Sequence, residues 1–432
     1  MLHSESADIT SKMPYDWQTQ FPAEYLEKKG VKPLGALGAL PAVDQAREVV
    51  KSYVMKHWHD IARSAVGQLR YPYLVPGATY EQLWDWDAYL SAIALPDEGL
   101  PYLEGSIRNL VENTRQDGRP PKLGLPDGTF NYDLSPIPLH AQFVYLACQR
   151  AGSFELASKL WENLLRIRHW YETQSTADNG LFVWLTYRGN GLDNNPAVYG
   201  RPAKSVSSID LAVWHQREYQ ALAVIARELG EVDAQSWQQR ADNMRILICK
   251  QYWDTIDELF YGIDCLTDTQ QMGLLKVTWP VFLKFRNWSC LFPLWARIAT
   301  QQQADVLMDK VIDPLEYLSD AGIRSHSKRD PVYNNHPTGN PSNWQGPVWV
   351  LSTALTCYGL HSYGRSNHAV KAASALIQTV AADIQTHGCM HEFYHGDTGQ
   401  PVIKPGFLSW NLLAGRLLDD LDTKTDPLAI VC

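Results

Sequence analysis

Residues 141–172 read AQFVYLACQRAGSFELASKLWENLLRIRHWYE, and this stretch decides the expected fold. Apolar side chains recur every three or four positions on both sides of Gly152 and Ser153, which predicts two amphipathic helices. Glycine is favoured just after a helix ends, and serine is favoured where the next helix begins. The stretch therefore predicts a helical hairpin with a short joint.

The same hairpin pattern recurs along the chain, with further joints near Gly230 and Gly364. Strand patterns are few and short, at 181–186 and 399–403, and no fixed-period repeat of the tetratricopeptide or leucine-rich kind is present. The periodicity predicts about twelve helices. We expect them at 41–66, 84–95, 101–116, 136–151, 153–173, 208–229, 233–252, 289–299, 301–312, 347–363, 365–386 and 406–421.

Short joints alternate with long joints that are rich in Gly, Pro, Asn, Asp and aromatic residues. Long loops in a compact domain usually carry function. Six hairpins could close into an (α/α)6 toroid or stack as an open solenoid. The alternation favours the toroid, an all-α fold in which the long joints gather at one end as a polar, aromatic-lined active site. The long joints are 117–135, 174–207, 253–288, 313–346 and 387–405, within one catalytic barrel at 41–425 that follows an N-terminal extension at 1–40.

Composition excludes several classes of protein. The formal net charge of −9 argues against nucleic acid as a partner. The seven cysteines form no C-x-x-C pair, which is typical of reduced thiols in a cytoplasmic protein. We see no signal peptide, no run of apolar residues long enough to span a membrane, and no nucleotide or other cofactor motif. The sequence leaves the oligomeric state open.

Aromatic residues are abundant, with 16 tryptophans and 21 tyrosines. A large core explains most of them, but a carbohydrate site is the sharper explanation, because indole rings stack on the apolar faces of sugars. The segment LWDWDAYL at 83–90 combines Trp84 and Trp86 with two aspartates, which resist burial unless they are paired or bonded. A buried core with a helix cap would account for the same pattern.

Two acids lie in long joints. Asp193 lies in the turn-rich segment 187–201, and Glu392 lies among aromatic and histidine residues at 387–399. Asp193 could instead form an Asx turn, and Glu392 could make a structural bond. Glycoside hydrolysis needs two carboxylates, and a barrel can bring two distant loops face to face.

Other loops offer polar and aromatic groups. In NPSNWQGPVW at 340–349, Trp344 and Trp349 flank Gln345, which could bond sugar hydroxyls or simply pack at the start of a helix. Asn131 lies near another helix start. The histidines of the chain, among them His391, show no spacing typical of metal ligands, so we expect no metal site.

Five motifs occur in an order that resembles glycoside hydrolase family 63, nearest to its bacterial mannosylglycerate and glucosylglycerate hydrolases. They are LWDWDAYL at 83–90, GLDNNP at 191–196, NWQGPVW at 343–349, EFYHGDTG at 392–399 and GFLSW at 406–410, so the resemblance spans roughly residues 50–420. The resemblance implies a toroid that hydrolyses α-linked sugars with inversion. It implies that Asp193 is the general acid and that Glu392 is the general base.

The resemblance also implies a sugar-binding set, in which Trp84 or Trp86 stacks on the sugar, Asp87 accepts bonds from two hydroxyls, and Asp85 caps its helix. The family more often has arginine at the position of Gln345, which leaves the substrate open. The full set of expected substrate-binding residues is Trp84, Trp86, Asp87, Asn131, Arg201, Trp344, Gln345, Trp349 and Trp410.

We therefore expect a cytoplasmic, metal-independent, inverting α-glycosidase that acts on a small α-glucoside or α-mannoside. Glucosylglycerate or mannosylglycerate are examples, and Arg201 is the candidate partner for a substrate carboxylate, although a surface arginine would look the same. Three alternatives stay open: a trehalase- or invertase-like disaccharide hydrolase, a sugar epimerase on the same toroid, and a sugar-binding protein without activity. An epimerase would need a histidine pair that we do not find.

Overall fold

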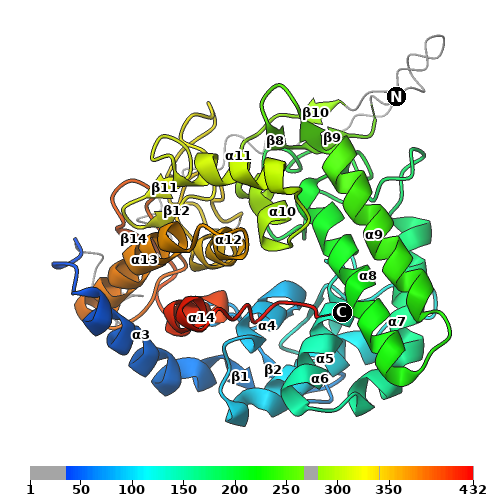
Figure 1. Cartoon of the computed structure of the whole chain (residues 1–432). Helices are drawn as coiled ribbons and strands as arrows, with labels where there is room; N and C mark the ends of the chain where they lie inside the picture. Colours follow the sequence, from blue (N-terminus) through cyan, green and yellow to red (C-terminus); the bar gives the residue numbers. More distant parts are fainter. Residues whose placement is uncertain (1–35, 267–280, 340, 432) are drawn as a thin grey trace, which may run out of the picture.

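The helices of the chain follow one another around a ring (Figure 1). The computed structural model describes residues 36–266, 281–339 and 341–431, so most of the expected N-terminal extension lies outside the described residues. No helix within those ranges is long and apolar enough to cross a membrane. The longer helices are α3 (Val43–His57), α4 (Asp85–Ala92), α5 (Leu100–Glu112), α6 (His140–Ala151), α7 (Glu155–Gln174), α8 (Ile209–Leu229), α9 (Ala234–Gln251), α11 (Gln301–Ile312), α12 (Val350–Ser362) and α13 (Ser366–His387).

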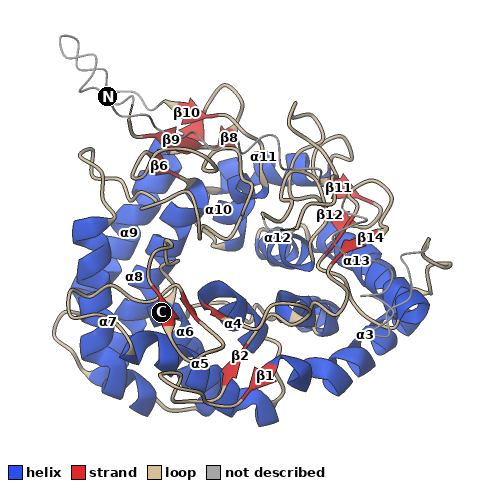
Figure 2. Cartoon of the chain, turned by 180° about the vertical axis from the view of Figure 1, so that it is seen from behind, coloured by secondary structure: helices blue, strands red, loops and turns tan. Residues whose placement is uncertain are grey.

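Shorter elements complete the fold, and the view from behind shows the strands as small pieces between helices (Figure 2). The short helices are η1 (Trp58–Ile61), η2 (Asp97–Gly99), η3 (Trp288–Leu291), α10 (Phe292–Trp295), η4 (Ser409–Gly415) and α14 (Leu417–Thr423). The strands are β1 (Ala62–Arg63), β2 (Tyr73–Leu74), β3 (Leu83–Trp84), β4 (Leu123–Gly124), β5 (Phe130–Asn131), β6 (Val206–Ser207), β7 (Trp253–Asp254), β8 (Leu259–Phe260), β9 (Gly262–Asp264), β10 (Phe282–Leu283), β11 (Leu318–Ser319), β12 (Gly322–Ile323), β13 (Phe393–Tyr394) and β14 (Pro401–Ile403).

Helix pairs form the ring. Helix α8 packs against α9, and α12 packs against α13, while the short α10 lies between α8 and α12. Glycines end two of the predicted hairpin helices in the left-handed conformation, Gly152 with φ 65° after α6 and Gly230 with φ 74° after α8. Helix α3 packs against α13 and η4, so elements near the two ends of the described chain meet and close the ring.

Most predicted helices are confirmed, and α11 coincides with the predicted range 301–312. The helix predicted at 41–66 ends earlier, because the chain tightens into η1 and then pairs β1 with β2. The helix predicted at 406–421 is divided into η4 and α14.

The strand predicted at 181–186 is wrong. Phe182 makes only an isolated bridge to Thr176, and the segment is an extended loop. Most of its apolar side chains are buried, and Val183 and Trp184 donate their backbone N–H groups to Ser175 and Val206 outside any ladder. The strand predicted at 399–403 is confirmed as β14.

Four of the five predicted long joints supply residues to one pocket. Joint 117–135 supplies Lys122, 174–207 supplies Asp193, 313–346 supplies Trp344 and 387–405 supplies Glu392. Joint 253–288 contributes no lining residue within the part of the chain that the structure describes.

Candidate active site

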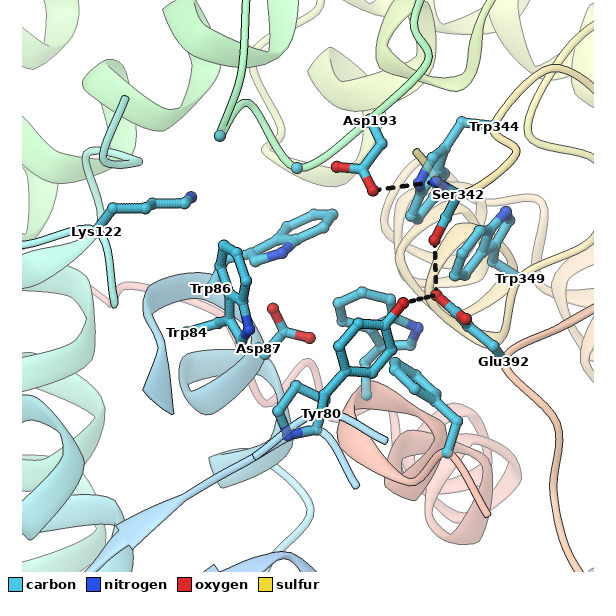
Figure 3. A pocket seen from close by; sticks show the side chains of 15 residues that line it. Tyr80, Trp84, Trp86, Asp87, Lys122, Asp193, Ser342, Trp344, Trp349 and Glu392 are labelled. Carbon is cyan, nitrogen blue, oxygen red and sulfur yellow. Dashed lines mark hydrogen bonds between the residues drawn. The ribbon is translucent and has the colours of Figure 1, made fainter. Parts of the chain in front are cut away.

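A pocket lies among the loops (Figure 3). Concave sites that combine aromatic side chains with a few polar groups are where small molecules usually bind. The wall combines a large aromatic surface with three carboxyl groups and one lysine. Its lining residues are Pro76, Tyr80, Trp84, Trp86, Asp87, Lys122, Gly189, Gly191, Asp193, Ser342, Trp344, Trp349, Glu392, Phe407 and Trp410.

The tryptophans form a connected wall. Trp344 stacks on Trp349 with a ring separation of 3.9 Å and an interplanar angle of 3°. The Trp86 ring lies 4.9 Å from Trp410 and 6.0 Å from Trp344. The buried indole Nε1 of Trp410 has no hydrogen-bond partner among the described residues. The wall therefore offers flat apolar faces together with an unused donor, a combination that suits a sugar ring.

Glu392 is buried at the edge of the pocket, just before β13. Its backbone N–H donates to Ile403 O at 3.0 Å, which fixes it to β14. Its Oε1 accepts the Ser342 hydroxyl at 2.9 Å and the Tyr80 hydroxyl at 3.5 Å, whereas its Oε2 has no partner among the described residues. Burial raises the pKa of Glu392 to about 8.

Asp193 faces the same pocket from a tight turn (Figure 3). Its Oδ2 accepts the backbone N–H of Ser342 at 3.1 Å, and burial raises the pKa of Asp193 to about 6. Gly191 makes this turn possible, because its φ is +89° and a Cβ there would lie 2.9 Å from Cζ2 of Trp86. The turn can therefore approach the tryptophan wall closely.

A loop that includes Ser342 joins the two carboxyl groups. Ser342 donates its N–H to Asp193 and its hydroxyl to Glu392. The same loop binds the Asp193 turn through Asn194, whose Oδ1 accepts the Trp344 N–H at 2.7 Å and whose backbone oxygen accepts Gln345 Nε2 at 2.8 Å. The loop thus fixes the two acids relative to each other.

Asp87 is the third carboxyl of the pocket and lies in the first turn of α4. Its Oδ1 accepts the Ser409 hydroxyl at 2.9 Å. Burial raises the pKa of Asp87 to about 7. Asp87 therefore lies where a carboxylate can accept hydrogen bonds from sugar hydroxyls.

Asp85 has a different role from its neighbour. It is the first residue of α4, after the N-cap Trp84, and it is fully buried. It accepts backbone N–H bonds from Trp86 at 2.7 Å and Ile137 at 2.9 Å, and its Oδ1 lies 2.7 Å from Nζ of Lys122. The prediction that Asp85 caps α4 is therefore wrong, because Trp84 is the N-cap residue, and Asp85 instead forms a buried ion pair that holds Lys122 beside the pocket.

A buried cluster lies behind Glu392. The Nδ1 atoms of His387 and His391 lie 2.8 and 2.9 Å from the Asp383 carboxylate, which also accepts the Tyr394 hydroxyl at 3.0 Å. Burial opposes ionisation of Asp383, but the charge of His391 and the bonds from both histidines lower its pKa. The three residues could hold a metal ion, a possibility that our inspection of histidine spacing missed. In the structure, hydrogen bonds organise them.

Two predicted binding residues lie outside the pocket lining. Asn131 Oδ1 accepts the N–H groups of Asp133 at 3.0 Å and Leu134 at 3.4 Å, which is local turn chemistry. Gln345 is occupied by Asn194 and also accepts Asn334 Nδ2 at 2.8 Å. We therefore remove Asn131 and Gln345 from the candidate binding set.

Arg201 is also absent from the pocket lining. Its guanidinium lies 3.6 Å from the Asp264 carboxylate. The cation among the described lining residues is Lys122, which the sequence analysis missed. We therefore remove Arg201 and replace it with Lys122 as the group that could interact with an anion.

The sequence analysis also missed Tyr80, Ser342 and Phe407. Phe407 lies within the GFLSW motif, so that motif could have identified it. Ser342 lies one residue before NWQGPVW, and Tyr80 lies shortly before LWDWDAYL. Proximity to these motifs was the available signal, although a single serine or tyrosine in a loop carries little information by itself.

Comparisons with known proteins identify the family of the chain. A family model described as the mannosylglycerate hydrolase MGH1-like glycoside hydrolase domain matches residues 80–410, more than three quarters of the chain. A probable trehalase of Saccharomyces cerevisiae is 20% identical over 389 residues, which cover 72% of this chain and 47% of that protein. The chain thus spans about half the length of this relative.

Solved structures share the fold. A GH63 mannosylglycerate hydrolase from Thermus thermophilus, in complex with Tris and D-glycerate, matches with a TM-score of 0.64 and 18% identity, covering 84% of this chain and 98% of that chain. The neutral trehalase from Saccharomyces cerevisiae matches with a TM-score of 0.62 and 15% identity, covering 88% and 82%. At these identities the likeness supports the helical fold alone.

Proposed function

The chain belongs to the mannosylglycerate hydrolase MGH1-like family of glycoside hydrolase domains, and from this membership we propose that it is an inverting α-glycosidase on an (α/α)6 toroid. One observation carries the proposal. Asp193 and Glu392, from loops far apart in sequence, face one tryptophan-lined pocket and are joined through Ser342. Two carboxyl groups beside an enclosed sugar are what glycoside hydrolysis requires.

In the proposed reaction, Asp193 donates a proton to the glycosidic oxygen as its bond to the anomeric carbon breaks. Glu392 accepts a proton from a water molecule, whose oxygen forms the new bond from the opposite face. The Oε2 atom of Glu392, which lacks a partner among the described residues, is the acceptor for that proton. Asp87 and the tryptophan wall hold the sugar.

Both pKa values are raised, so the pair holds one proton near neutral pH. In the empty pocket the higher pKa belongs to Glu392, at about 8, against about 6 for Asp193. The proposed roles need this proton on Asp193 when substrate is bound. Groups that favour the ionised form of Glu392 therefore help to place the proton on Asp193. Two such groups are the Ser342 hydroxyl and the charge of Lys404.

For the substrate, we propose a small α-glucoside or α-mannoside. A glycosylglycerate is one candidate, supported by the family, and its carboxylate would need a cation such as Lys122. A trehalase-like disaccharide hydrolase is the second candidate. Three carboxyl groups and one lysine line the pocket, and this balance favours an uncharged sugar. We also propose a cytoplasmic location, supported by free thiols at Cys148, Cys249, Cys290, Cys357 and Cys389, and testable by cell fractionation.

The test is a panel of trehalose, sucrose, glucosylglycerate, mannosylglycerate and simple α-glycosides, with wild type, Asp193→Asn and Glu392→Gln. We expect hydrolysis by wild type, and losses of about 10²- to 10⁴-fold in each variant with folding intact. Proton NMR should show the β-anomer first. The α-anomer first would refute inversion, isomerisation without hydrolysis would favour an epimerase, and binding without turnover would favour a sugar-binding protein.

A further inference from the structure

We propose that Ser342 is a positioning residue that couples the two carboxyl groups and keeps Glu392 available as the general base. This inference rests on the proposed function and adds a residue that the two-carboxylate mechanism does not name. Ser342 contacts both acids: its backbone N–H donates to Asp193 and its hydroxyl donates to Glu392 (Figure 3).

The Ser342 hydroxyl has a specific effect on Glu392. It donates to Oε1 at 2.9 Å, and a donor to a carboxylate favours the ionised form that a base needs. Because Oε1 is engaged in this bond, the other oxygen, Oε2, is the one left without a partner among the described residues. The bond therefore selects which oxygen meets the attacking water.

The position of Ser342 is itself fixed. The adjacent Asn343 is fully buried, and its Nδ2 donates to Asn334 Oδ1 and His336 O, each at 2.9 Å. On the other side of Asn343, Trp344 donates its N–H to Asn194 in the Asp193 turn. Because these bonds hold the loop directly after Ser342, the serine can bridge the acids without a large loss of conformational freedom on binding.

Other groups face Glu392, and they are weaker or opposed. The Tyr80 hydroxyl lies at 3.5 Å from the same oxygen, near the limit for a hydrogen bond. Asp87 and Asp193 disfavour ionisation of Glu392 by their charge, and Lys404 favours it. Ser342 is therefore the short hydrogen-bond donor to this carboxyl, and its removal should act on Glu392 more than removal of the tyrosine hydroxyl.

The experiment compares Ser342→Ala, Ser342→Thr and the control Tyr80→Phe. All three retain the backbone N–H that binds Asp193. Loss of a hydrogen bond to a charged group should lower kcat about ten- to hundredfold in Ser342→Ala, with KM changed little. The alkaline limb of the pH profile of kcat/KM should move to higher pH, because this limb follows the pKa of Glu392 and the ionised form of Glu392 has lost a donor. Ser342→Thr should restore both quantities, and Tyr80→Phe should move the limb less.

Three outcomes would overturn the inference: an unchanged alkaline limb in Ser342→Ala, a larger shift in Tyr80→Phe than in Ser342→Ala, or a shift of the acid limb alone. Failure of the proposed function is distinguishable, because wild type would then hydrolyse no glycoside. A carbon-13 NMR titration of the Glu392 carboxyl, assigned with Glu392→Gln, reads the hydrogen bond without turnover. A higher pKa in Ser342→Ala supports the inference, and an unchanged pKa refutes it.

Discussion

Replacement of Asp85 by alanine should destabilise the fold far more than loss of an ordinary helix cap. The carboxylate is fully buried, accepts two backbone N–H bonds, and lies 2.7 Å from Nζ of the equally buried Lys122. Removal of one partner of a buried ion pair typically costs about 3–5 kcal/mol, because the other charge remains in a poorly solvated site. We expect Asp85→Ala to lower the free energy of unfolding by that amount.

The assay is urea denaturation followed by circular dichroism, on Asp85→Ala, Lys122→Met and the double variant. The double variant should lose less than the sum of the two single losses, because it leaves no uncompensated charge. Asp44→Ala is the matched control, since Asp44 is an exposed carboxylate in the first turn of α3, and it should cost less than about 1 kcal/mol. A loss below about 1 kcal/mol in Asp85→Ala, or strict additivity in the double variant, would refute this reasoning.

Three further predictions concern the pocket. Glu392→Gln should stabilise the fold increasingly as pH rises from about 4.5 to 8, by on the order of 5 kcal/mol, because the wild-type carboxyl has its pKa raised to about 8 in the folded protein and resists ionisation there. Thermal melts from pH 5 to 9 check this, and a constant difference contradicts it. The pH profile of kcat/KM of wild type should be bell-shaped, with limbs near pH 6 and 8, which are the pKa values of Asp193 and Glu392. Below the first limb the pair has no base, and above the second limb it has no acid. A kcat/KM that is constant between pH 5 and 9 would exclude this pair. Asp87→Ala should lower kcat/KM about 10³-fold or more while the fold is retained, because sugar hydroxyls lose their acceptor. The control is Ser409→Ala, which removes only the hydrogen bond to Asp87 and should lower kcat/KM less.

The helices could be predicted from sequence because their signal is local. Helix α11 was predicted to the residue, and the paired helices α6 and α7 followed from apolar periodicity with a glycine at the joint. The segment 181–186 was misassigned because a continuous apolar run indicates that a segment is buried, but it does not show whether the backbone pairs with a neighbouring strand. In the same way, no local pattern marks the point near His57 where α3 stops and the chain turns back.

The site was predictable where several chemical signals coincide in one motif. Tryptophan next to acid, or acid in a glycine turn, identified Asp87, Asp193 and Glu392 as pocket residues. Single polar residues were not predictable, because an amide or a cation is satisfied by whatever partner the fold brings near it. Gln345 therefore binds Asn194 in a neighbouring loop and Arg201 lies against Asp264 of β9, while Ser342 and Lys122, which carry no sequence signal of their own, line the pocket.

The closure of the ring by α3 against α13 and η4 has a consequence for how the protein acquires its structure. Hairpins such as α8 with α9 unite neighbours in sequence, and local contacts of this kind form quickly, whereas contacts between chain ends must wait for a costly loop closure. The pocket lining runs from Pro76 to Trp410, and α4, which carries Asp87, packs against η4, which carries Trp410, so the lining is complete only when contacts between distant parts of the chain have formed. A nascent or refolding chain can thus be largely helical and still lack the binding pocket. Binding of a sugar ligand would then measure completion of the ring, which helix content alone does not.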